Sequence, residues 1–295
     1  MPGLLLRVRT KMSLFAHRRT LDLLEGGYAS VHHGRSHDFD DLRAYVPGDE
    51  VRDIDWKATA RHGEPLVKRY IASRRRHLVL VVDTGRNMAA TAAGGETKKD
   101  IAVMAAGALG YIAAQHGDVV SLVAGDESGT RAHPAGSTDA HLEMLLRRVD
   151  ERVSLEAPRS DLHGVLSWVA RGVRRRSMLL VVADDVVVDE ALEKLLRRLR
   201  AQHEILWLTV GDADLMSRTG HARDLYDVQE ASGLPAYLRE NGALRVAFDA
   251  SSERRVGDAE RQLQALGISS VRLTAQSQVV PGLSALIEKH RRARR

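Results

Sequence analysis

The sequence predicts an α/β protein with a doubly wound, mostly parallel sheet and an N-terminal β-rich flap. Two observations carry this prediction. From residue 78 onward, short apolar runs alternate with stretches of helical periodicity, which is the pattern of strand–helix–strand units. The runs at residues 78–82 and 178–183 are almost continuously apolar, as expected for strands buried on both faces of a parallel sheet.

Length and composition describe a globular protein with room for one large domain and an appendage. The chain has 295 residues, of which 44% are hydrophobic and 28% charged. It contains no cysteine, which excludes disulfides, thiol catalysis and thiolate metal sites. No apolar run approaches the roughly 18 residues of a membrane span, and the apolar stretch at the N-terminus is too short for a signal peptide. We therefore expect a cytoplasmic protein with no membrane span.

The net positive charge is concentrated near the N-terminus. Residues 1–77 carry 15 Lys and Arg against 10 Asp and Glu, whereas the rest of the chain carries 29 of each kind. Such a surplus suggests an acidic partner surface, anionic lipid or nucleic acid, and a solvated basic face explains it equally well. We expect no nucleic-acid binding; a strong salt dependence of binding would reveal it.

The sequence divides into a lead-in at residues 1–30, a flap at 31–76, a main domain at 77–291 and a basic tail at 292–295. The lead-in is predicted to be helical from Thr20 to Leu24. In the flap, Ile54, Trp56 and Ala58 alternate with charged residues, which predicts a half-buried strand with the Trp56 ring inside. We expect this flap to pack beside the main sheet.

The main domain is predicted to continue the alternation of strands and helices. Further strands are expected at residues 119–124, 130–133, 178–183, 205–210 and 271–273. Helices are expected after Gly95, from residue 138 or 139 to about 149, after an N-cap at Ser160, around 192–199, and from Pro281 onward. Residues 211–242 are less regular and are interpreted as a surface excursion.

Aspartates follow two of the predicted strands directly. Asp83 ends the first strand, and Asp184 and Asp185 follow the strand at residues 178–183. In open α/β sheets ligands bind beyond the carboxyl ends of the strands, and Mg²⁺ prefers oxygen ligands. The alternative role of such aspartates is to cap helices or to accept backbone N–H groups. We expect Asp184 at an exposed strand end, where its replacement has little effect on stability.

The strand, Asp83, the polar turn and Met88 resemble the first strand of a von Willebrand factor type A domain, a Rossmann-like fold. The metal-ion-dependent adhesion site of that family reads D-x-S-x-S, with a Thr before a later helix and an Asp after a later strand. Position by position, the resemblance implies a metal site of Asp83, Asn87, Ser160 and Asp184. Because glycine stands at 85, the implied site is degenerate: it requires no cofactor and binds Mg²⁺ or Mn²⁺ weakly. Serine at positions 85 and 87 is expected to tighten that binding.

Residues 34–70 resemble the signature of the "domain of unknown function 58" (DUF58) family. The resemblance lies in the runs YVPGD at residues 45–49, VRDIDWK at 51–57 and VKRY at 67–70. It implies a von Willebrand factor A-like domain after the block. It also implies a MoxR-type AAA+ ATPase as partner, in a chaperone-like system that acts on a client protein. Many relatives carry two membrane-spanning helices before this block, and none is predicted here.

Acidic and basic residues alternate within the same block. They are Arg43, Asp49, Arg52, Asp53, Asp55, Lys57 and Arg61. One interpretation is a charged docking face for the partner. The other is a framework of ion pairs, each contributing about 0–1 kcal/mol when exposed.

We predict a non-catalytic interaction module rather than an enzyme. The alternative is a Mg²⁺-dependent, phosphatase-like hydrolase that uses Asp83 with Asp184 or Asp185. Such enzymes need an acid two residues after the nucleophile, and Gly85 stands there, so no general acid protonates the leaving group. The sequence contains no G-x-x-x-x-G-K-[ST] loop, so the chain is not itself a P-loop ATPase.

Overall fold

The structure is a computed structural model of the chain. It describes residues 3–16, 18–32, 41–47, 49, 54–69, 75–212, 226–228, 232–233 and 242–293. Contacts divide the chain into two compact units. The larger unit combines Met1–Tyr28 with Arg76–Arg295, and the smaller unit is Ala29–Arg75.

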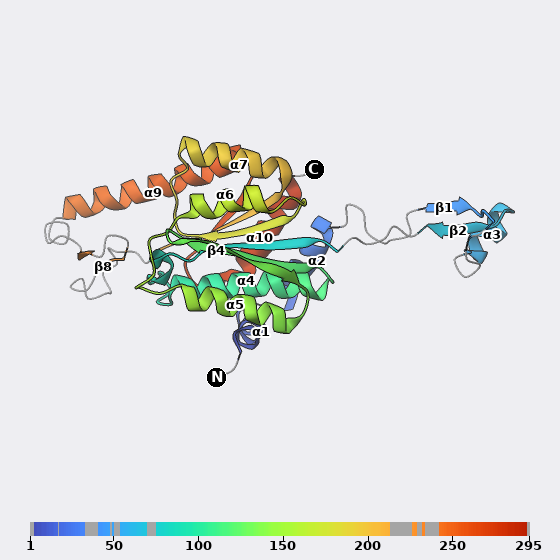
Figure 1. Ribbon diagram of the computed structural model, residues 1–295, viewed down its shortest axis with the longest axis horizontal. Helices are drawn as coiled ribbons and strands as arrows, with labels where there is room; N and C mark the ends of the chain where they lie inside the picture. Colours follow the sequence, from blue (N-terminus) through green and yellow to red (C-terminus); the bar gives the residue numbers. More distant parts are fainter. Residues whose placement is uncertain are drawn as a thin grey trace. The chain divides into compact units, whose positions relative to one another are not determined.

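The larger unit is built on a six-stranded sheet with the strand order β10-β7-β6-β3-β4-β5 (Figure 1). All neighbouring strands are parallel except β4 and β5, so the predicted doubly wound, mostly parallel α/β fold is confirmed. The strands are β3 (His77–Asp83), β4 (Val119–Asp126), β5 (Gly129–Gly136), β6 (Met178–Ala183), β7 (Glu204–Val210) and β10 (Ser269–Leu273). A separate short pair is formed by β8 (Tyr226–Asp227) and β9 (Ser232–Gly233).

Strand β3 lies in the middle of the sheet and is buried on both faces. Residues 78–82 are at most 1% exposed, as the continuous apolar run predicted. Val79 and Val81 belong to a core cluster with α6 and α7. The alternate residues of the strand point to the opposite face, because side chains alternate along a strand. Asp83 is therefore held at the end of a central strand that is buried on both faces.

Helices cover both faces of the sheet, as Figure 1 shows. One face carries α4 (Lys98–Gln115), α5 (Asp139–Arg152) and α10 (Val279–Ala293). The other carries α6 (Leu162–Gly172), α7 (Glu190–Gln202) and α9 (Gly242–Ala265). Among the residues that the structure describes, no helix is both long and apolar enough to cross a membrane.

Helix α4 follows β3 and is buried on nearly every side, between the sheet and the outer helices α1 and α5. Thr97 is its N-cap and accepts a hydrogen bond from the N–H of Asp100, while the Asp100 carboxylate accepts the N–H of Thr97. Gly107 and Gly110 lie against Val8 and Leu142, where a Cβ would collide with the neighbouring side chain. The start of α4 is thus fixed by its cap and its packing.

Two N-terminal helices lie in the region predicted as a lead-in. These are α1 (Leu4–Phe15) and α2 (Arg18–His32), so the predicted helix at 20–24 is part of a longer one. The N–H groups of Leu4 and Leu5 donate to the carboxylate of Glu143 on α5, at 3.1 and 2.7 Å. That contact satisfies donors that a helix N-terminus leaves open. Helix α1 packs on α4 and α5 in the larger unit.

The smaller unit contains a strand pair and a short helix. Strand β1 (Asp41–Ala44) pairs antiparallel with β2 (Leu66–Arg69). The prediction of a strand around Trp56 is wrong, because helix α3 (Trp56–His62) begins there. Asp55 accepts the N–H groups of Lys57 and Ala58 and so caps this helix. Trp56 is 64% exposed, so the predicted burial of its ring is also wrong.

Most of the other predicted elements are present, with three differences. The N-cap of α6 is Asp161, which accepts the N–H of Gly164 at 2.8 Å, and not Ser160. Helix α10 begins at Val279, two residues before Pro281. Helix α9 was not predicted. Most of the predicted surface excursion at 211–242 lies outside the described residues.

The antiparallel edge strand β5 is irregular. Its pairing with β4 shifts between the pairs Val120–Gly136 and Leu122–His133, so Pro134 and Ala135 stand opposite a single residue of β4. This is a β-bulge.

Candidate functional site

Carboxylates follow four neighbouring parallel strands at one edge of the sheet. Asp212 follows β7, Asp184 and Asp185 follow β6, Asp83 ends β3, and Asp126 ends β4. We call these five residues the carboxylate rim. The sequence predicted Asp83, Asp184 and Asp185 at this edge and missed the other two. The rim stands where open α/β sheets bind ligands.

A buried lysine lies among these carboxylates. The Lys98 side chain is 1% exposed, and its Nζ lies 2.5 Å from Oδ1 of Asp184 and also contacts Oδ1 of Asp212. Burial opposes the charged form of Lys98, but the two aspartates outweigh it and raise the pKa of the ammonium group. Lys98 is the first residue of α4, so the capped start of that helix places it. Lys98 is therefore a charged and fixed part of the site.

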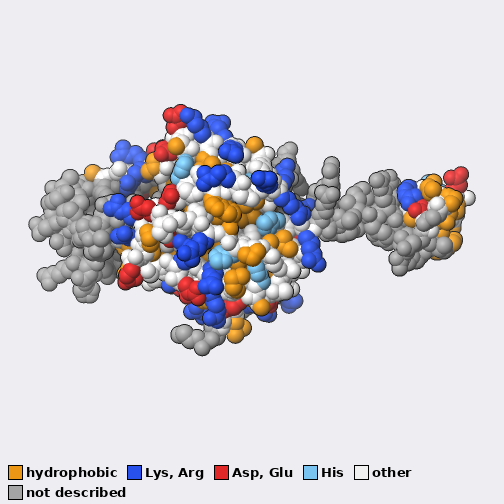
Figure 2. Space-filling view, viewed as in Figure 1, with side chains coloured by type: hydrophobic (Ala, Val, Ile, Leu, Met, Phe, Trp, Pro, Cys, Tyr) orange, Lys and Arg blue, Asp and Glu red, His pale blue; other side chains and the backbone are white. Residues whose placement is uncertain are grey.

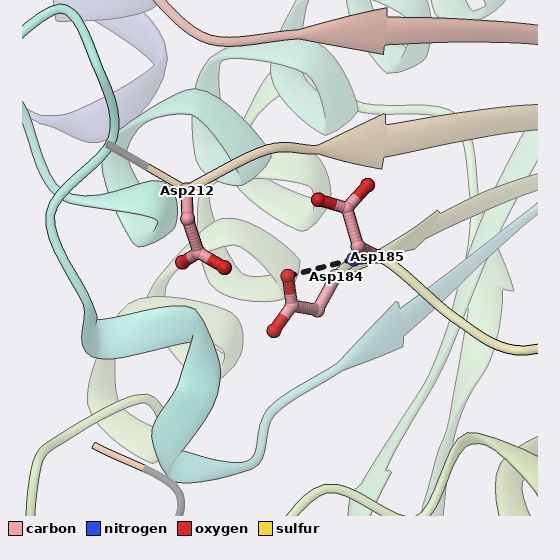
Figure 3. A group of neighbouring side chains, drawn as sticks. All are labelled: Asp184, Asp185 and Asp212. Atoms are coloured by element: carbon pink, nitrogen blue, oxygen red, sulfur yellow. Dashed lines mark hydrogen bonds between the residues drawn. The ribbon is translucent and has the colours of Figure 1, made fainter. Parts of the chain in front are cut away.

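Asp184 and Asp185 are adjacent in sequence but pair with different cations. Their side chains point in opposite directions in Figure 3, which also shows the backbone N–H of Asp185 donating to Oδ1 of Asp184. Asp184 faces Lys98. Asp185 accepts two hydrogen bonds from the Arg272 guanidinium on β10, at 3.0 and 2.7 Å. The hydrogen bonds to Asp185 raise the pKa of Arg272.

The expectation that Asp184 lies exposed at a strand end is wrong. Its side chain is 13% exposed. Burial raises the pKa of Asp184, and the charge of Lys98 opposes that rise. Removal of Asp184 would leave the buried ammonium group with Asp212 alone, so Asp184 contributes to stability as well as to the rim.

Asp83 differs from the rest of the rim because no described cation lies within ion-pair distance of its carboxylate. It is 2% exposed and accepts a hydrogen bond from the N–H of Gly85 at 2.9 Å. Burial raises the pKa of Asp83 to about 6, against the opposing effects of the Gly85 N–H, the Ser160 hydroxyl and Lys98. The hydroxyl of Ser160 is buried and lowers this pKa by its nearness, although it forms no hydrogen bond of standard geometry with the described residues.

The backbone of Ser160 occupies the space beside Gly85. A Cβ on Gly85 would overlap the N, Cα and Oγ atoms of Ser160. Two backbone hydrogen bonds fix the residues before Ser160. The N–H of Arg86 donates to Pro158 O, and the N–H of Glu127 donates to Arg159 O. A serine side chain at position 85 therefore has no room in this structure, so we now expect Gly85→Ser not to tighten metal binding.

Contacts at the rim are described for three residues of the predicted metal set, Asp83, Ser160 and Asp184. Asp83 lies beside Ser160, and Asp184 lies beside Lys98. Asn87 lies on the short 3-10 helix η3 (Arg86–Ala89) that follows the Gly85 turn. The described residues place Lys98 close enough to influence both aspartates.

The carboxylate oxygens of Asp184, Asp185 and Asp212 lie within 4.8 Å of one another. Three carboxylates at this spacing suit a divalent cation in their ligand type. Here each of these three carboxylates already faces Lys98 or Arg272. A metal ion would have to displace a buried ammonium group, so this donor set does not fit a metal.

The comparisons with known proteins agree with the signature in the smaller unit. Residues 41–255 match the family described as "Protein of unknown function DUF58". The chain belongs to the DUF58 family. Relatives of this DUF58 chain include the uncharacterized proteins Rv1480 of Mycobacterium tuberculosis and Mb1516 of Mycobacterium bovis. Each is 28% identical over 296 residues, covering 99% of this chain and 91% of the relative.

Solved structures similar to the DUF58 chain include three distant ones. An aerotolerance-related membrane protein from Bacteroides fragilis has 13% identity and a TM-score of 0.45, covering 72% of this chain and 99% of that one. A von Willebrand factor type A structure from Catenulispora acidiphila has 10% identity and a TM-score of 0.42, covering 76% and 43%. The pilus adhesin SpaC from Lactobacillus rhamnosus GG has 10% identity and a TM-score of 0.45, covering 74% and 30%.

At the β4 end of the carboxylate rim, Asp126 is paired with Arg152 of α5. Their side chains meet at 2.7 Å, and Ser128 also donates to Asp126. Burial works to raise the pKa of Asp126, but the hydrogen bonds from Ser128 and Arg152 hold it below its ordinary value. Asp126 is thus an ionised, structurally paired carboxylate.

The predicted docking face of the DUF58 signature block is only partly described. Arg43 forms two hydrogen bonds with Asp49, at 2.7 and 2.5 Å, and Asp55 caps α3. Lys57 and Arg61 are exposed on α3. Arg52 and Asp53 lie outside the described residues. On the face of the molecule shown in Figure 2, Lys and Arg side chains lie in several separate groups.

Besides Asp126, three residues of the site were missed by sequence reasoning. Lys98 and Arg272 are basic residues beside a helix start and within a strand, where they are usually solvated. Asp212 follows the strand at 205–210 just as Asp83 and Asp184 follow theirs, so the same rule would have found it. The signal for Lys98 was weaker, because Lys99 beside it has the same residue type.

Proposed function

We propose that this DUF58 chain is a non-catalytic interaction module that binds a MoxR-type AAA+ ATPase in a chaperone-like system with a client protein. The observation that carries the proposal is the carboxylate rim, in which most acids are already held by cations of the chain itself. A rim of fixed charges is suited to recognition rather than to turnover. The choice of ATPase rests on the family resemblance of the signature block.

The environment of Asp83 supports a non-catalytic role. A nucleophilic aspartate must reach the phosphorus atom of its substrate, and Asp83 is almost fully buried. The position two residues later, where a phosphatase of this type carries its general acid, is Gly85 against the backbone of Ser160. The Lys98 ammonium group also takes the oxygens of Asp184 that a catalytic Mg²⁺ would need.

Exposed apolar side chains close to the rim support a protein partner. Val187, in the loop after β6, is 72% exposed. Leu155, in the loop that leads to Ser160, is 59% exposed. Asp212 presents a half-exposed carboxylate at the same edge of the sheet. Protein interfaces combine apolar contacts with a polar and charged surround, and these loops offer both.

A binding experiment with the full chain tests the proposal. The chain is immobilised and exposed to a purified MoxR-type ATPase, with and without ATP. Val187→Asp places a charge at the rim without touching the core, and we expect it to weaken capture by about tenfold or more. Arg148→Glu changes a residue on α5 whose side chain is 52% exposed and serves as the control. Failure of the unchanged chain to capture the ATPase in either nucleotide state would contradict the proposal.

The charged surface of the smaller unit is tested in the same assay. The double variant Lys57→Glu with Arg61→Glu reverses two exposed charges on α3. We expect it to capture the ATPase as the unchanged chain does. A loss confined to this double variant would move the docking site from the rim to the smaller unit.

The alternative hydrolase function is tested separately. With p-nitrophenyl phosphate and Mg²⁺ we expect no turnover by the full chain. Turnover that disappears in Asp83→Asn would overturn the non-catalytic proposal.

A further inference from the structure

The inference begins with the position of the Lys98 ammonium group. It is buried, and it contacts carboxylate oxygens delivered by two neighbouring strands, Asp184 after β6 and Asp212 after β7. Asp83 lies at the end of the next strand and feels the same charge. The ammonium group is therefore the cation around which this part of the rim is arranged.

We propose that Lys98 is a built-in substitute for a divalent metal ion at the rim, and that its ammonium group excludes Mg²⁺ and Mn²⁺ from Asp184, Asp185 and Asp212. The proposal assigns a role to a lysine that is neither in the family signature block nor in the predicted metal set. Glycine at position 85 agrees with this role, because a site without a metal needs no hydroxyl ligand there.

Cations of the chain compensate two of the three negative charges at this part of the rim. Lys98 pairs with Asp184 and Asp212, and Arg272 pairs with Asp185. Three carboxylates thus face two cations that belong to the chain. Oxygen ligands at a spacing of 4.8 Å or less would attract a divalent cation strongly if these positive charges were absent.

Helix α4 holds the ammonium group in place. Lys98 follows the N-cap Thr97, and its N–H donates to Ala90 O at 2.8 Å. The helix dipole disfavours a positive charge in the first helical turn, so it does not explain why a lysine stands at this position. The contacts with the aspartates do account for it. Because the ammonium group is covalently attached to the chain, it cannot dissociate from the rim as a metal ion can.

The adjacent residue provides a matched control. Lys99 has the same residue type, but its side chain is 27% exposed and pairs with Asp150 at 3.4 Å; among the described contacts it has none with a rim aspartate. Removal of Lys99 therefore changes the net charge of the protein by the same amount and leaves the rim intact.

Mn²⁺ titration of the full chain tests the proposal, with free Mn²⁺ followed by electron paramagnetic resonance. We expect no Mn²⁺ binding at the rim of the unchanged chain or of Lys99→Ala. Lys98→Ala removes the built-in cation and should bind Mn²⁺ with an affinity at least about tenfold above any residual binding by the unchanged chain. The double variant Lys98→Ala with Asp184→Asn should lose that binding.

Two results would overturn the proposal. One is a folded Lys98→Ala protein that binds Mn²⁺ no better than Lys99→Ala does. The other is Mn²⁺ binding by the unchanged chain that Asp184→Asn abolishes, a measurement that does not depend on the folding of any Lys98 variant. Melting curves with and without Mn²⁺ provide a second readout, because a bound ion raises the melting temperature only where its site exists.

Discussion

Gly211 lies against the guanidinium group of Arg272, which crosses the end of β7 on its way from β10 to Asp185 beside β6. A Cβ at position 211 would overlap Cζ and both terminal nitrogens of Arg272. The glycine thus leaves the passage through which the arginine spans an intervening strand. The ion pair depends on a residue that takes no part in it.

Gly211→Ala should therefore break the ion pair between Arg272 and Asp185. The arginine side chain is flexible and can move away, so we expect a loss of only about 1 kcal/mol in the free energy of unfolding, which is the scale of a partly exposed pair. Urea denaturation measures it. In the background of Arg272→Ala the same substitution should cost much less, because the overlap is gone. Equal costs in both backgrounds would show that Gly211 matters for another reason.

Asp184→Ala should destabilise the protein by about 3 kcal/mol, because it leaves a buried ammonium group with one remaining partner. The matched variant Asp185→Ala removes a carboxylate that is 31% exposed and should cost about 1 kcal/mol. Denaturation curves of both proteins provide the comparison. Similar losses for the two variants would mean that Lys98 does not depend on Asp184.

Asp83 should make the stability of the protein depend on pH. Its pKa in the folded protein is about 6, above the ordinary value of 3.8, so the folded state holds the proton more tightly than the unfolded state. The contribution of Asp83 is therefore most favourable at low pH and declines as the pH rises from about 3.8 to about 6. Asp83→Asn keeps an acceptor for the Gly85 N–H and removes the titration.

Denaturation of Asp83→Asn at two pH values tests this dependence. Its stability relative to the unchanged chain should rise by about 2 kcal/mol between about pH 4.5 and pH 7.5. Asp126→Asn provides a control of opposite sign, because the pKa of Asp126 is lowered and its stabilising effect is lost as the pH falls. If the free energies of unfolding of Asp83→Asn and the unchanged chain changed with pH by the same amount, the raised pKa of Asp83 would be contradicted.

Gly85→Ser should destabilise the protein by about 1–3 kcal/mol or more, since the new side chain meets backbone atoms of Ser160 that cannot rotate away. It should not create Mn²⁺ binding. Asn87→Ser, on η3, is the control and should stay within about 1 kcal/mol. Thermal melts and Mn²⁺ titration check both variants. A stable Gly85→Ser protein that binds Mn²⁺ would show that the Ser160 loop moves aside.

The sheet was predictable because its strands are buried on both faces and therefore carry continuous apolar runs. The same rule placed Asp83 and Asp184 at one edge. Helix α9 escaped prediction because the apolar residues of 242–265 form no single stripe, so the periodic signal is weak. The prediction of a strand at Trp56 failed because Asp55 accepts the capping hydrogen bonds that start a helix there. Alternation of apolar and charged residues alone suggested a strand.

The role of Lys98 was not predictable from the sequence. Burial of a lysine depends on carboxylates that are 86 and 114 positions away and that only the strand order brings together. The overlap between position 85 and the backbone of Ser160 is equally non-local. Motif matching therefore identified the edge of the sheet but not the buried lysine that lies there.

The bulge at Pro134 and Ala135 affects how this sheet meets other molecules. Strand β5 is a sheet edge, and an edge with a regular row of free N–H and C=O groups invites pairing with a strand from another molecule. Pro134 has no N–H to offer, and the extra residue of the bulge disturbs the spacing of the groups beside it. The edge is thereby protected against the strand-to-strand association that leads to aggregates.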